Sequence, residues 1–475
     1  MRPSAHRQVW AVLLSSWLVL LVLTTEVAMG ATSPVQVYPF APELPGSTHY
    51  RLQVNDQPVF VHAAEVADFA CFAIGGPVTV SVTCNEEVTS ALVRPRSRKI
   101  ETRIAGKTVS FTVDGPGPLT LEVNGKIRPA LHLFIDPPEE NAPAVGAPGV
   151  VRFAGNKVHE VGEIVLKDNE TLYLEPGAVV RGVVRATGAK NVRILGRGIL
   201  DARTRTTKTK FVDLRDCDGV QMSDVTVVGS FGWTLVPWRC RNVRFTNVKV
   251  FSWRDNDDGL DICGCRDVVV DRCFFRTKDD CISIKSPQFD PSGKNDVADV
   301  LVQRSVFWNA EWGNAMEIGF ELQTPKISGI VWRDCDIIRV ETGAVFSIHN
   351  GGVATVQDVL FDNIRVEDAR DKLLDLHVGL SIYSDDCPER YHRRNPQRKP
   401  TGAGPWVPFS LLTEEEQAVS RQRRGAIRNV RLKDIQLLEQ VPPHSFIIND
   451  GGTLENVTYE SVLHEGKALQ VPTTQ

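Results

Sequence analysis

The chain has 475 residues, of which 42% are hydrophobic and 24% are charged, and its formal net charge at pH 7 is −4. This composition is typical of a globular protein, and the length predicts two domains or one large repetitive domain. The mild negative charge argues against a nucleic-acid partner, which would require clustered positive charge.

The first 30 residues carry the pattern of a signal peptide. Arg2 and Arg7 precede an apolar run from Val9 to Leu23, and residues 28–30 offer a small-residue cleavage site. A membrane anchor is the alternative, but the run of about 15 residues is shorter than the ~20 that a spanning helix needs. We therefore expect residues 1–30 to be removed, and the protein to be secreted or periplasmic, monomeric and without a membrane partner.

Ten cysteines in an exported protein permit disulfide bonds. Cys71 and Cys84 are an isolated pair in the first part of the chain, and we expect them to form a bridge. No Cys or His arrangement has the spacing of a zinc site. The sequence therefore predicts no metal site of this type.

Residues 31–140 indicate a small β-sandwich domain. Short strand-like segments separated by turns occupy residues 50–61, 76–84, 107–117 and 118–125. A polar, proline-rich stretch follows at residues 136–143 and predicts a domain boundary. The sandwich contains no catalytic constellation, so we expect it to support the second domain or present substrate to it.

The second part, residues 145–470, repeats itself. Its unit is an apolar residue preceded by Asn, Asp or Gly and followed by another apolar residue five positions later. A period of 20–30 residues without helical periodicity predicts an all-β solenoid, here a right-handed single-stranded parallel β-helix. The copies begin at Val192, Val220, Val243, Val268, Val300, Ile330, Val359, Val430 and Val457.

Three cysteines occupy equivalent repeat positions, each three residues before the valine of its copy: Cys217, Cys240 and Cys265. We expect them to stack in a column inside the solenoid. An insertion at about residues 369–424 lengthens one interval and is rich in arginine. It predicts either a solvated surface loop or a lid that carries positive charge toward an acidic substrate.

The stretch from Trp253 to Lys285 carries the candidate chemistry. Asp258 lies between Asn256 and Gly259, and Asp279 and Asp280 follow 21 and 22 residues later. If one turn takes about that many residues, the carboxylates meet on neighbouring turns, where like charges raise one another's pKa. Such a group can supply the acid and the base of glycoside hydrolysis. Adjacent residues of a strand point to opposite faces. Asp279 and Asp280 can therefore both face the groove only if the backbone bends at these two residues.

The motifs Asn256-x-Asp258-Gly259 and Asp279-Asp280-Cys281-Ile282 resemble the polygalacturonase family of glycoside hydrolases, family 28, and the likeness spans roughly residues 150–465. The resemblance implies a pectin-lyase-like β-helix that cleaves galacturonan by inversion. It also implies that Asp279 is the general acid and that Asp258 and Asp280 activate water. The expected partner is a polysaccharide or oligosaccharide, without a cofactor or metal.

Two signatures of that family are altered here. Asn314 stands where the family has the histidine of Gly-His-Gly, and the Arg-Ile-Lys signature is missing, its nearest candidate being residues 346–349. These losses put strict polygalacturonase activity in doubt but leave the carboxylates in place. The residues that we expect to contact substrate are Asn256, Lys285, Asn314, Glu317, His349, Trp253 and Trp312.

Several alternatives remain open at the level of sequence. A dextranase- or isopullulanase-like glucan hydrolase also joins a sandwich to a β-helix and uses a similar aspartate triad. A calcium site is a further use of clustered carboxylates, although EF-hand spacing is absent. A calcium-dependent pectate lyase would cleave by elimination. A non-catalytic β-helix that binds carbohydrate would keep its binding after loss of all three aspartates.

Overall fold

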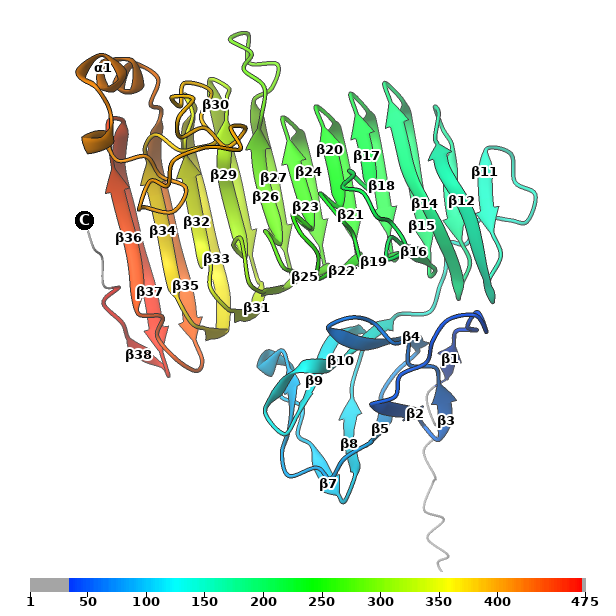
Figure 1. Ribbon diagram of the computed structural model, residues 1–475. Helices are drawn as coiled ribbons and strands as arrows, with labels where there is room; N and C mark the ends of the chain where they lie inside the picture. The colour runs from blue at the N-terminus through cyan, green and yellow to red at the C-terminus, as the bar shows by residue number, and fades with distance from the viewer. Residues whose placement is uncertain (1–33, 472–475) are drawn as a thin grey trace, which may run out of the picture. The chain divides into compact units, whose positions relative to one another are not determined.

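The computed structural model describes residues 34–471, and Ser33–Gln475 cluster into one compact unit (Figure 1). The expected signal peptide, residues 1–30, lies outside the described residues, so export stays a prediction. Within residues 34–471, no helix combines the length and the apolar character that crossing a bilayer requires.

The N-terminal part consists of two five-stranded sheets that enclose one apolar core. Alternating side chains of β5 illustrate the reason, because Val78, Val80 and Val82 are buried while Thr79 and Thr83 are exposed. One sheet has the order β1 (Val35–Val37), β4 (Ala67–Ile74), β10 (Lys126–Asp136), β9 (Gly117–Val123), β6 (Ala91–Arg94), with the 3-10 helix η1 at Arg96–Arg98. The other has the order β3 (Gln57–Val59), β2 (Tyr50–Val54), β5 (Val78–Cys84), β8 (Thr108–Val113), β7 (Arg103–Ala105).

The prediction of a disulfide bond between Cys71 and Cys84 is wrong, since both thiols are free. Cys84 belongs to the apolar core between the two sheets, whereas Cys71 packs with a different cluster on the outer side of β4. The Cys71 sulfur lies 3.8 Å from the hydroxyl of Thr226 in the second part of the chain. The alternation of side chains along β4 therefore directs Cys71 away from the sandwich core that contains Cys84 of β5.

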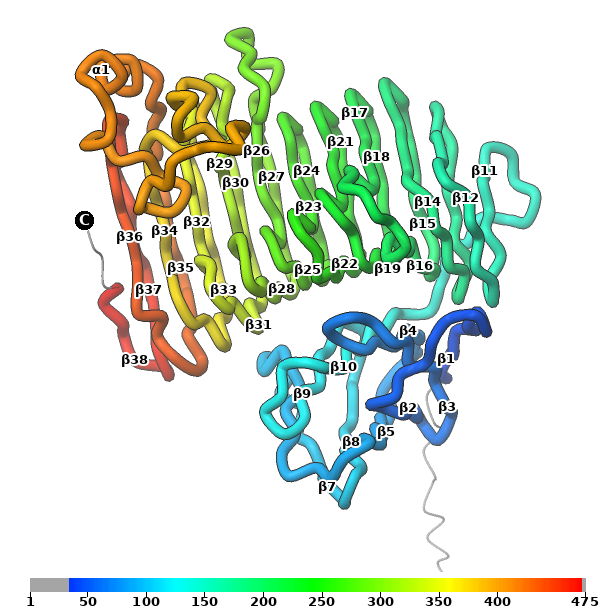
Figure 2. The backbone as a smooth tube through the Cα atoms, in the orientation of Figure 1, coloured from blue at the N-terminus to red at the C-terminus, as the bar shows by residue number. Residues whose placement is uncertain are grey.

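Residues 150–468 form a parallel β-helix of stacked turns (Figure 2). The first strands are β11 (Val150–Phe153), β12 (Lys157–Val165), β13 (Thr171–Leu174) and β14 (Ala178–Thr187). From β15 to β32 each turn contributes one strand to each of three faces, and β38 (Lys467–Ala468) pairs antiparallel with the end of the last long strand.

The first face, called here the site face, contains β17 (Val212–Arg215), β20 (Leu235–Trp238), β23 (Leu260–Cys263), β26 (Ile282–Ser286), β29 (Met316–Leu322), β32 (Ala344–Asn350), β34 (Lys372–Val378) and β36 (His444–Asn449). The second contains β15 (Lys190–Gly196), β18 (Asp218–Ser223), β21 (Arg241–Thr246), β24 (Arg266–Asp271), β27 (Val297–Gln303) and β30 (Lys326–Arg333). The third contains β16 (Ile199–Asp201), β19 (Thr226–Val228), β22 (Lys249–Phe251), β25 (Phe274–Thr277), β28 (Val306–Asn309) and β31 (Asp336–Val340). The long strands β33 (Thr355–Ala369), β35 (Ala426–Leu437) and β37 (Thr453–His464) begin on the second face and continue along the third.

The repeat inferred from the sequence is confirmed residue by residue. Each apolar residue that begins a copy pairs with its equivalent on the next turn, from Val192 with Val220 to Val430 with Val457. The preceding residue adopts a left-handed conformation, as at Asn242 (φ 54°) and Asp267 (φ 57°). Asn, Asp and Gly tolerate this conformation better than other residues, which explains the repeat's recurring Asn, Asp or Gly.

The cysteine column is also confirmed. The Cys217 amide donates to the Cys240 sulfur over 3.4 Å, and the Cys240 amide donates to the Cys265 sulfur over 3.3 Å. All three side chains are buried in the apolar core of the β-helix. They are small interior residues, consistent with the way buried free cysteine packs.

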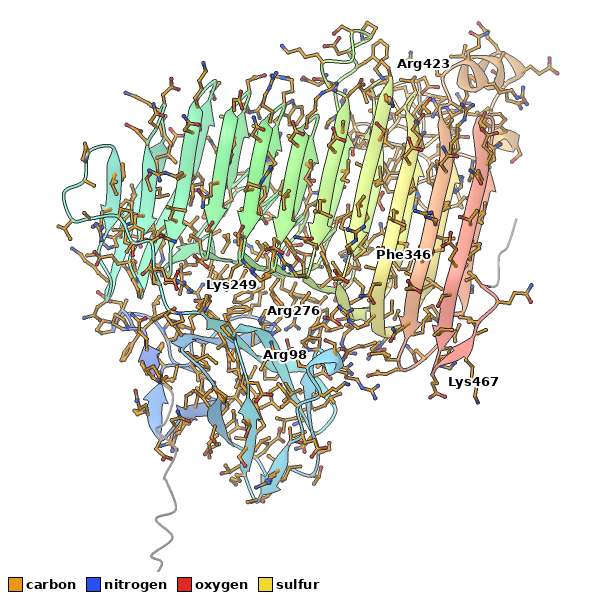
Figure 3. The ribbon with its side chains drawn as sticks, turned by 180° about the vertical axis from the view of Figure 1, so that it is seen from behind. Arg98, Lys249, Arg276, Phe346, Arg423 and Lys467 are labelled. Atoms are coloured by element: carbon orange, nitrogen blue, oxygen red, sulfur yellow. The ribbon has the colours of Figure 1, made fainter. Side chains whose placement is uncertain are left out.

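The sandwich packs against the third face of the β-helix (Figure 3). Phe69 and Phe134 of the sandwich share an apolar cluster with Phe251 and Phe274 of that face. Buried polar contacts cross the same interface: the Lys249 ammonium lies 2.6 Å from Asp136, and the Arg276 guanidinium lies 3.0 Å from the His132 ring. The site face is therefore left uncovered by the sandwich core.

The insertion begins later than the sequence pattern suggested. Residues 372–378 form the regular strand β34, which pairs with β32 and β36, so the extra residues run from 379 to 425. They include the 3-10 helix η2 (Phe409–Leu411) and the helix α1 (Glu414–Gln422). Thr413 caps α1 together with Glu416 in a reciprocal capping box. The division of the chain into separately folding domains stays a prediction.

Candidate active site

The length of one turn places Asp258 beside Asp280. Leu260 of β23 pairs with Ile282 of β26, a spacing of 22 residues that equals the spacing of the two aspartates. Backbone bonds continue this ladder before the strands, since the amide of Gly259 donates to the carbonyl of Asp280 over 2.9 Å. The expected meeting of these residues on neighbouring turns is therefore confirmed.

Asp279 and Asp280 lie in a bend that precedes β26, and strand alternation does not apply to them. Asp257 holds this bend. Its buried carboxylate accepts the amides of Lys278 (3.0 Å), Asp279 (2.9 Å) and Arg254 (2.9 Å), so it ties the loop of Asp258 to the loop of Asp279. The sequence analysis did not single out Asp257, because nothing in its neighbourhood distinguishes it from a turn aspartate.

We expect Asp257→Asn to lower the free energy of unfolding by about 1–3 kcal/mol, because its side-chain amide cannot accept all three backbone donors. The displaced loop would also lower kcat. Thermal denaturation and initial rates check this, with Asp255→Asn as the control. Asp255 is exposed in the same loop, and its substitution is expected to stay within about 0.5 kcal/mol. Equal effects of the two substitutions would contradict a positioning role for Asp257.

Lys285 is the cation of the carboxylate cluster. It lies on β26, where its ammonium is 2.6 Å from Asp258 and 2.8 Å from Asp261, and it rests 4.3 Å from the centre of the Trp233 ring. Burial opposes its charge, but Asp258 and Asp261 hold the pKa of Lys285 above its ordinary value. The ammonium therefore pairs directly with both carboxyls. Lys285 is thus an internal partner of the cluster.

The remaining carboxyl groups are poised to hold protons. Burial raises the pKa of Asp279 to about 7, and the charge of Asp258 adds to the shift. Burial likewise raises the pKa of Asp280 well above its ordinary value, with further contributions from Glu317 and Asp279. The carboxyl of Asp280 accepts a hydrogen bond from the backbone amide of Asn314 over 2.8 Å. Asp258 therefore lies beside two carboxyls whose pKa is raised by burial, an arrangement in which carboxyls can hold protons near neutral pH.

A polar column continues along the site face from Asn314. Its side-chain amide donates to Glu317 over 3.0 Å and approaches Asp280 at 3.4 Å. Glu317 is fully buried, bonds Ser347 and lies 3.0 Å from Nδ1 of His349. The other ring nitrogen of His349 lies 3.4 Å from Asp375. Burial alone would lower the pKa of His349, but Glu317 and Asp375 raise it to about 10, so this histidine is a paired cation.

The expected substrate contacts fall into three groups. Lys285, Asn314, Glu317 and His349 belong to the connected network of the site face, as the contacts above show. Asn256 lies at its margin, exposed, with its amide 3.3 Å from Asp258.

The two expected tryptophans differ in accessibility. Trp312 is 61% exposed on the loop next to Asp279, which leaves its ring open to a ligand. Trp253 has the guanidinium of Arg128 from the sandwich 3.9 Å from its ring centre, so one of its faces is covered. Its contact with substrate stays a prediction that must involve the other face.

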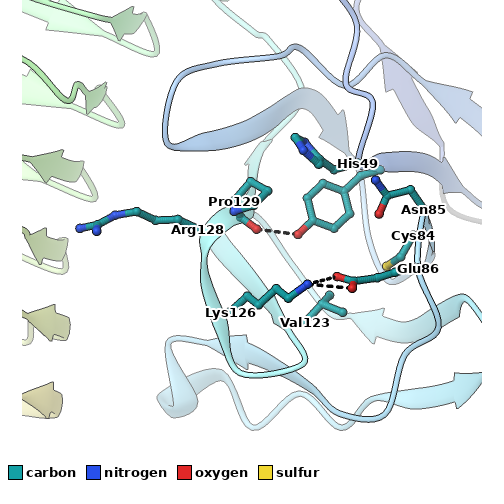
Figure 4. A pocket seen from close by; sticks show the side chains of 9 residues that line it. His49, Cys84, Asn85, Glu86, Val123, Lys126, Arg128 and Pro129 are labelled. Atoms are coloured by element: carbon teal, nitrogen blue, oxygen red, sulfur yellow. Dashed lines mark hydrogen bonds and ion pairs between the residues drawn. The ribbon is translucent and has the colours of Figure 1, made fainter.

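A separate hollow of about 550 Å³ lies in the sandwich (Figure 4). Its polar groups satisfy one another, because Lys126 pairs with Glu86 at 2.7 Å and the Tyr50 hydroxyl donates to the carbonyl of Pro129 over 2.7 Å. It contains none of the three candidate catalytic aspartates. We therefore place the candidate chemistry on the site face of the β-helix. The hollow is lined by His49, Tyr50, Cys84, Asn85, Glu86, Val123, Lys126, Arg128 and Pro129.

Comparison with known proteins agrees with this placement. Residues 180–374 match the glycosyl hydrolases family 28. The matching residues, called here the family 28 segment, contain all three candidate catalytic aspartates and the polar column as far as His349.

Two curated polygalacturonases are similar to part of this chain. Polygalacturonase QRT2 of Arabidopsis thaliana is 22% identical over 232 residues, which are 48% of this chain and 49% of the relative. A polygalacturonase of Chamaecyparis obtusa is 20% identical over 181 residues, which are 38% of this chain and 33% of the relative. The chain thus spans about half the length of the first and a third of the second.

A solved structure shares the fold over nearly the whole chain. Dex49A from Penicillium minioluteum is 14% identical, with a TM-score of 0.57, and the match covers 91% of this chain and 92% of that chain. At this identity the likeness concerns the fold alone. It supports the joined arrangement of small N-terminal sheets and parallel β-helix.

Other residues of the site escaped the sequence analysis. Asp375 and His377 of β34 extend the polar column, but their segment was assigned to the insertion. Continuing the repeat by one further turn would have found them. Tyr383 and Trp406 come from residues 379–425, where no repeat register exists to place them. Phe320 follows Glu317 on β29, and its contacts depend on that same insertion.

Proposed function

We propose that this protein is an exported glycoside hydrolase that cleaves a polysaccharide by inversion, using Asp258, Asp279 and Asp280. The observation that carries the proposal is the meeting of these three carboxyls on adjacent turns, inside the family 28 segment, with Lys285 paired to one of them. Export rests on the apolar pattern of residues 9–23.

The environments of the aspartates support distinct roles. Asp279 is half-buried, and its pKa of about 7 suits a group that protonates a leaving oxygen near neutral pH. Asp258 is held by Lys285 on the turn next to Asp280, which suits a group that positions the attacking water. Asp280 accepts the Asn314 amide and lies between the other carboxyls and Glu317, so it is placed to share the task of orienting that water.

The charges around the cluster bear on the expected galacturonan substrate. Each uronate carboxylate needs a cation, yet Lys285 is paired with Asp258 and Asp261. The cations expected from the insertion are also paired in three cases: Arg390 with Glu416, Arg393 with Glu321, and Arg424 with Asp386. On earlier turns, Lys210 lies over the Trp233 ring and Arg254 over the Phe231 ring. These two cations are candidates for uronate recognition beside the cluster.

Stereochemistry tests the proposal directly. If water attacks opposite the general acid, the first product carries the inverted anomeric configuration, and the acid and base carboxyls are about 6.5–9.5 Å apart. Time-resolved NMR during hydrolysis of a panel of polysaccharides, by the mature protein without added calcium, gives the anomer and shows saturated reducing ends. A retained anomer would make one aspartate a nucleophile, and unsaturated products would indicate a lyase.

A further inference from the structure

The insertion is an ordered segment that is fixed to the site face. Its ends are joined by Arg424, which is buried and donates to the carbonyl of Gly379 over 3.1 Å while pairing with Asp386 at 2.5 Å. It also has its own apolar core, which includes Leu380, Tyr391, Val407 and Leu412. Side chains that it presents to the β-helix are therefore held in place.

Three aromatic rings meet where the insertion contacts the site face. Phe320 of β29 lies 5.1 Å from the ring of Tyr383 and 5.2 Å from that of Trp406, both from the insertion. Trp406 stacks on His377 with a centre-to-centre distance of 3.6 Å and an angle of 11°. All three rings are half-buried, so each has accessible surface. We call Phe320, Tyr383 and Trp406 the aromatic wall.

Contacts connect the aromatic wall to the candidate catalytic carboxyls. Phe320 stacks on His349 at 4.5 Å, His349 is bound to Glu317, and Asn314 joins Glu317 to Asp280. Burial raises the pKa of Tyr383, and the charges of Glu321, Asp279 and Asp280 contribute to the shift. The aromatic wall thus lies within electrostatic reach of the reaction centre.

The charges beside the aromatic wall disfavour an anionic ligand. Arg393 lies 5.0 Å from the Tyr383 ring, but it is paired with Glu321 at 3.2 Å. His349 is shared between Glu317 and Asp375. A uronate placed here would meet Glu321 and the carboxyls of the cluster, and binding it would break an existing ion pair. Half-buried aromatic rings, in contrast, suit the apolar face of a sugar ring.

We propose that Trp406 and Phe320, with Tyr383, form a binding subsite for an uncharged glycosyl unit of the substrate, an inference that rests on the proposed hydrolase function. The insertion then determines specificity by supplying stacking surface beside an acidic cluster. The substrate chain has a neutral sugar at the end of the site face nearest β34 and the insertion.

Binding tests the subsite separately from catalysis. The Asp279→Asn protein, in which turnover should be strongly reduced, is run in affinity gel electrophoresis with dextran, pullulan, arabinan, galactan, xylan and polygalacturonate. At least one neutral polymer should retard it more than polygalacturonate does. In the Asp279→Asn protein, the further substitution Trp406→Ala should weaken the affinity for that neutral polymer roughly tenfold, as expected for the loss of a stacked ring. Trp406→Phe should retain most of the affinity.

Controls separate the subsite from general damage. Phe40→Ala removes a 41% exposed ring from the sandwich and should leave binding unchanged. Phe320→Leu provides a second variant in case Trp406→Ala unfolds the insertion, which circular dichroism and thermal denaturation would reveal. Tightest binding to polygalacturonate, no binding to any neutral polymer, or unchanged neutral binding in both wall variants would overturn the inference. Hydrolysis by the wild-type protein reports independently on the proposed function.

Discussion

Substituting Asp279 by Asn is expected to lower kcat by at least roughly 100-fold, because the leaving oxygen would lose its proton donor. Asn keeps the size of the side chain and can still accept the Asp280 amide that the Asp279 carboxylate accepts over 3.0 Å. The fold should therefore survive. Initial rates on the best polysaccharide substrate, with thermal denaturation in parallel, measure both effects. Turnover equal to that of the wild-type protein would remove Asp279 from the mechanism.

The pH profile gives Asp279 a more specific signature. Its pKa is raised to about 7, so the group is protonated below that pH and loses its proton as the pH rises through it. An acid must be protonated to act, so wild-type kcat should fall on the alkaline side of about pH 7. The residual activity of Asp279→Asn should lack this fall. Asp255→Asn, which changes an exposed carboxylate nearby, should keep the wild-type profile.

Replacing Lys285 by Met is expected to lower the free energy of unfolding by about 3–5 kcal/mol, because two buried carboxyls would lose their shared cation. Asp258 and Asp261 are both nearly inaccessible and lie 2.6 Å and 2.8 Å from the ammonium. Met preserves the apolar stem that packs beside Trp233. Denaturant unfolding at neutral pH measures the change.

An exposed ion pair of the same β-helix provides the control for Lys285. Lys433 lies 3.4 Å from Asp362 on the second face and is 41% exposed, so Lys433→Met should cost no more than about 1 kcal/mol. Adding Asp261→Asn to Lys285→Met should recover part of the lost stability, since one unpaired carboxylate is removed. If Lys285→Met costs no more than Lys433→Met, the buried pair does not stabilise the site face.

The sequence by itself determined the architecture of the β-helix and the place of its candidate chemistry. Valines at matched repeat positions, each after a residue that tolerates a left-handed backbone, define the turns because every inward side chain stacks on its equivalent. Once a turn is about 22 residues long, Asp258 and Asp280 must be neighbours. The cysteine column follows from the same register. These features depend on local conformation and on a period, and both are written in the chain.

Only the tertiary structure decided what surrounds those aspartates. Lys285 could have faced a substrate, but its strand position directs it to Asp258 and Asp261. Trp253 could have been open, but Arg128 arrives from a segment more than a hundred residues earlier. Cys71 and Cys84 could have bridged, but β4 directs one thiol toward the β-helix. Trp406 lies in an insertion with no repeat, so its place beside Phe320 depends on long-range packing that neither periodicity nor spacing encodes.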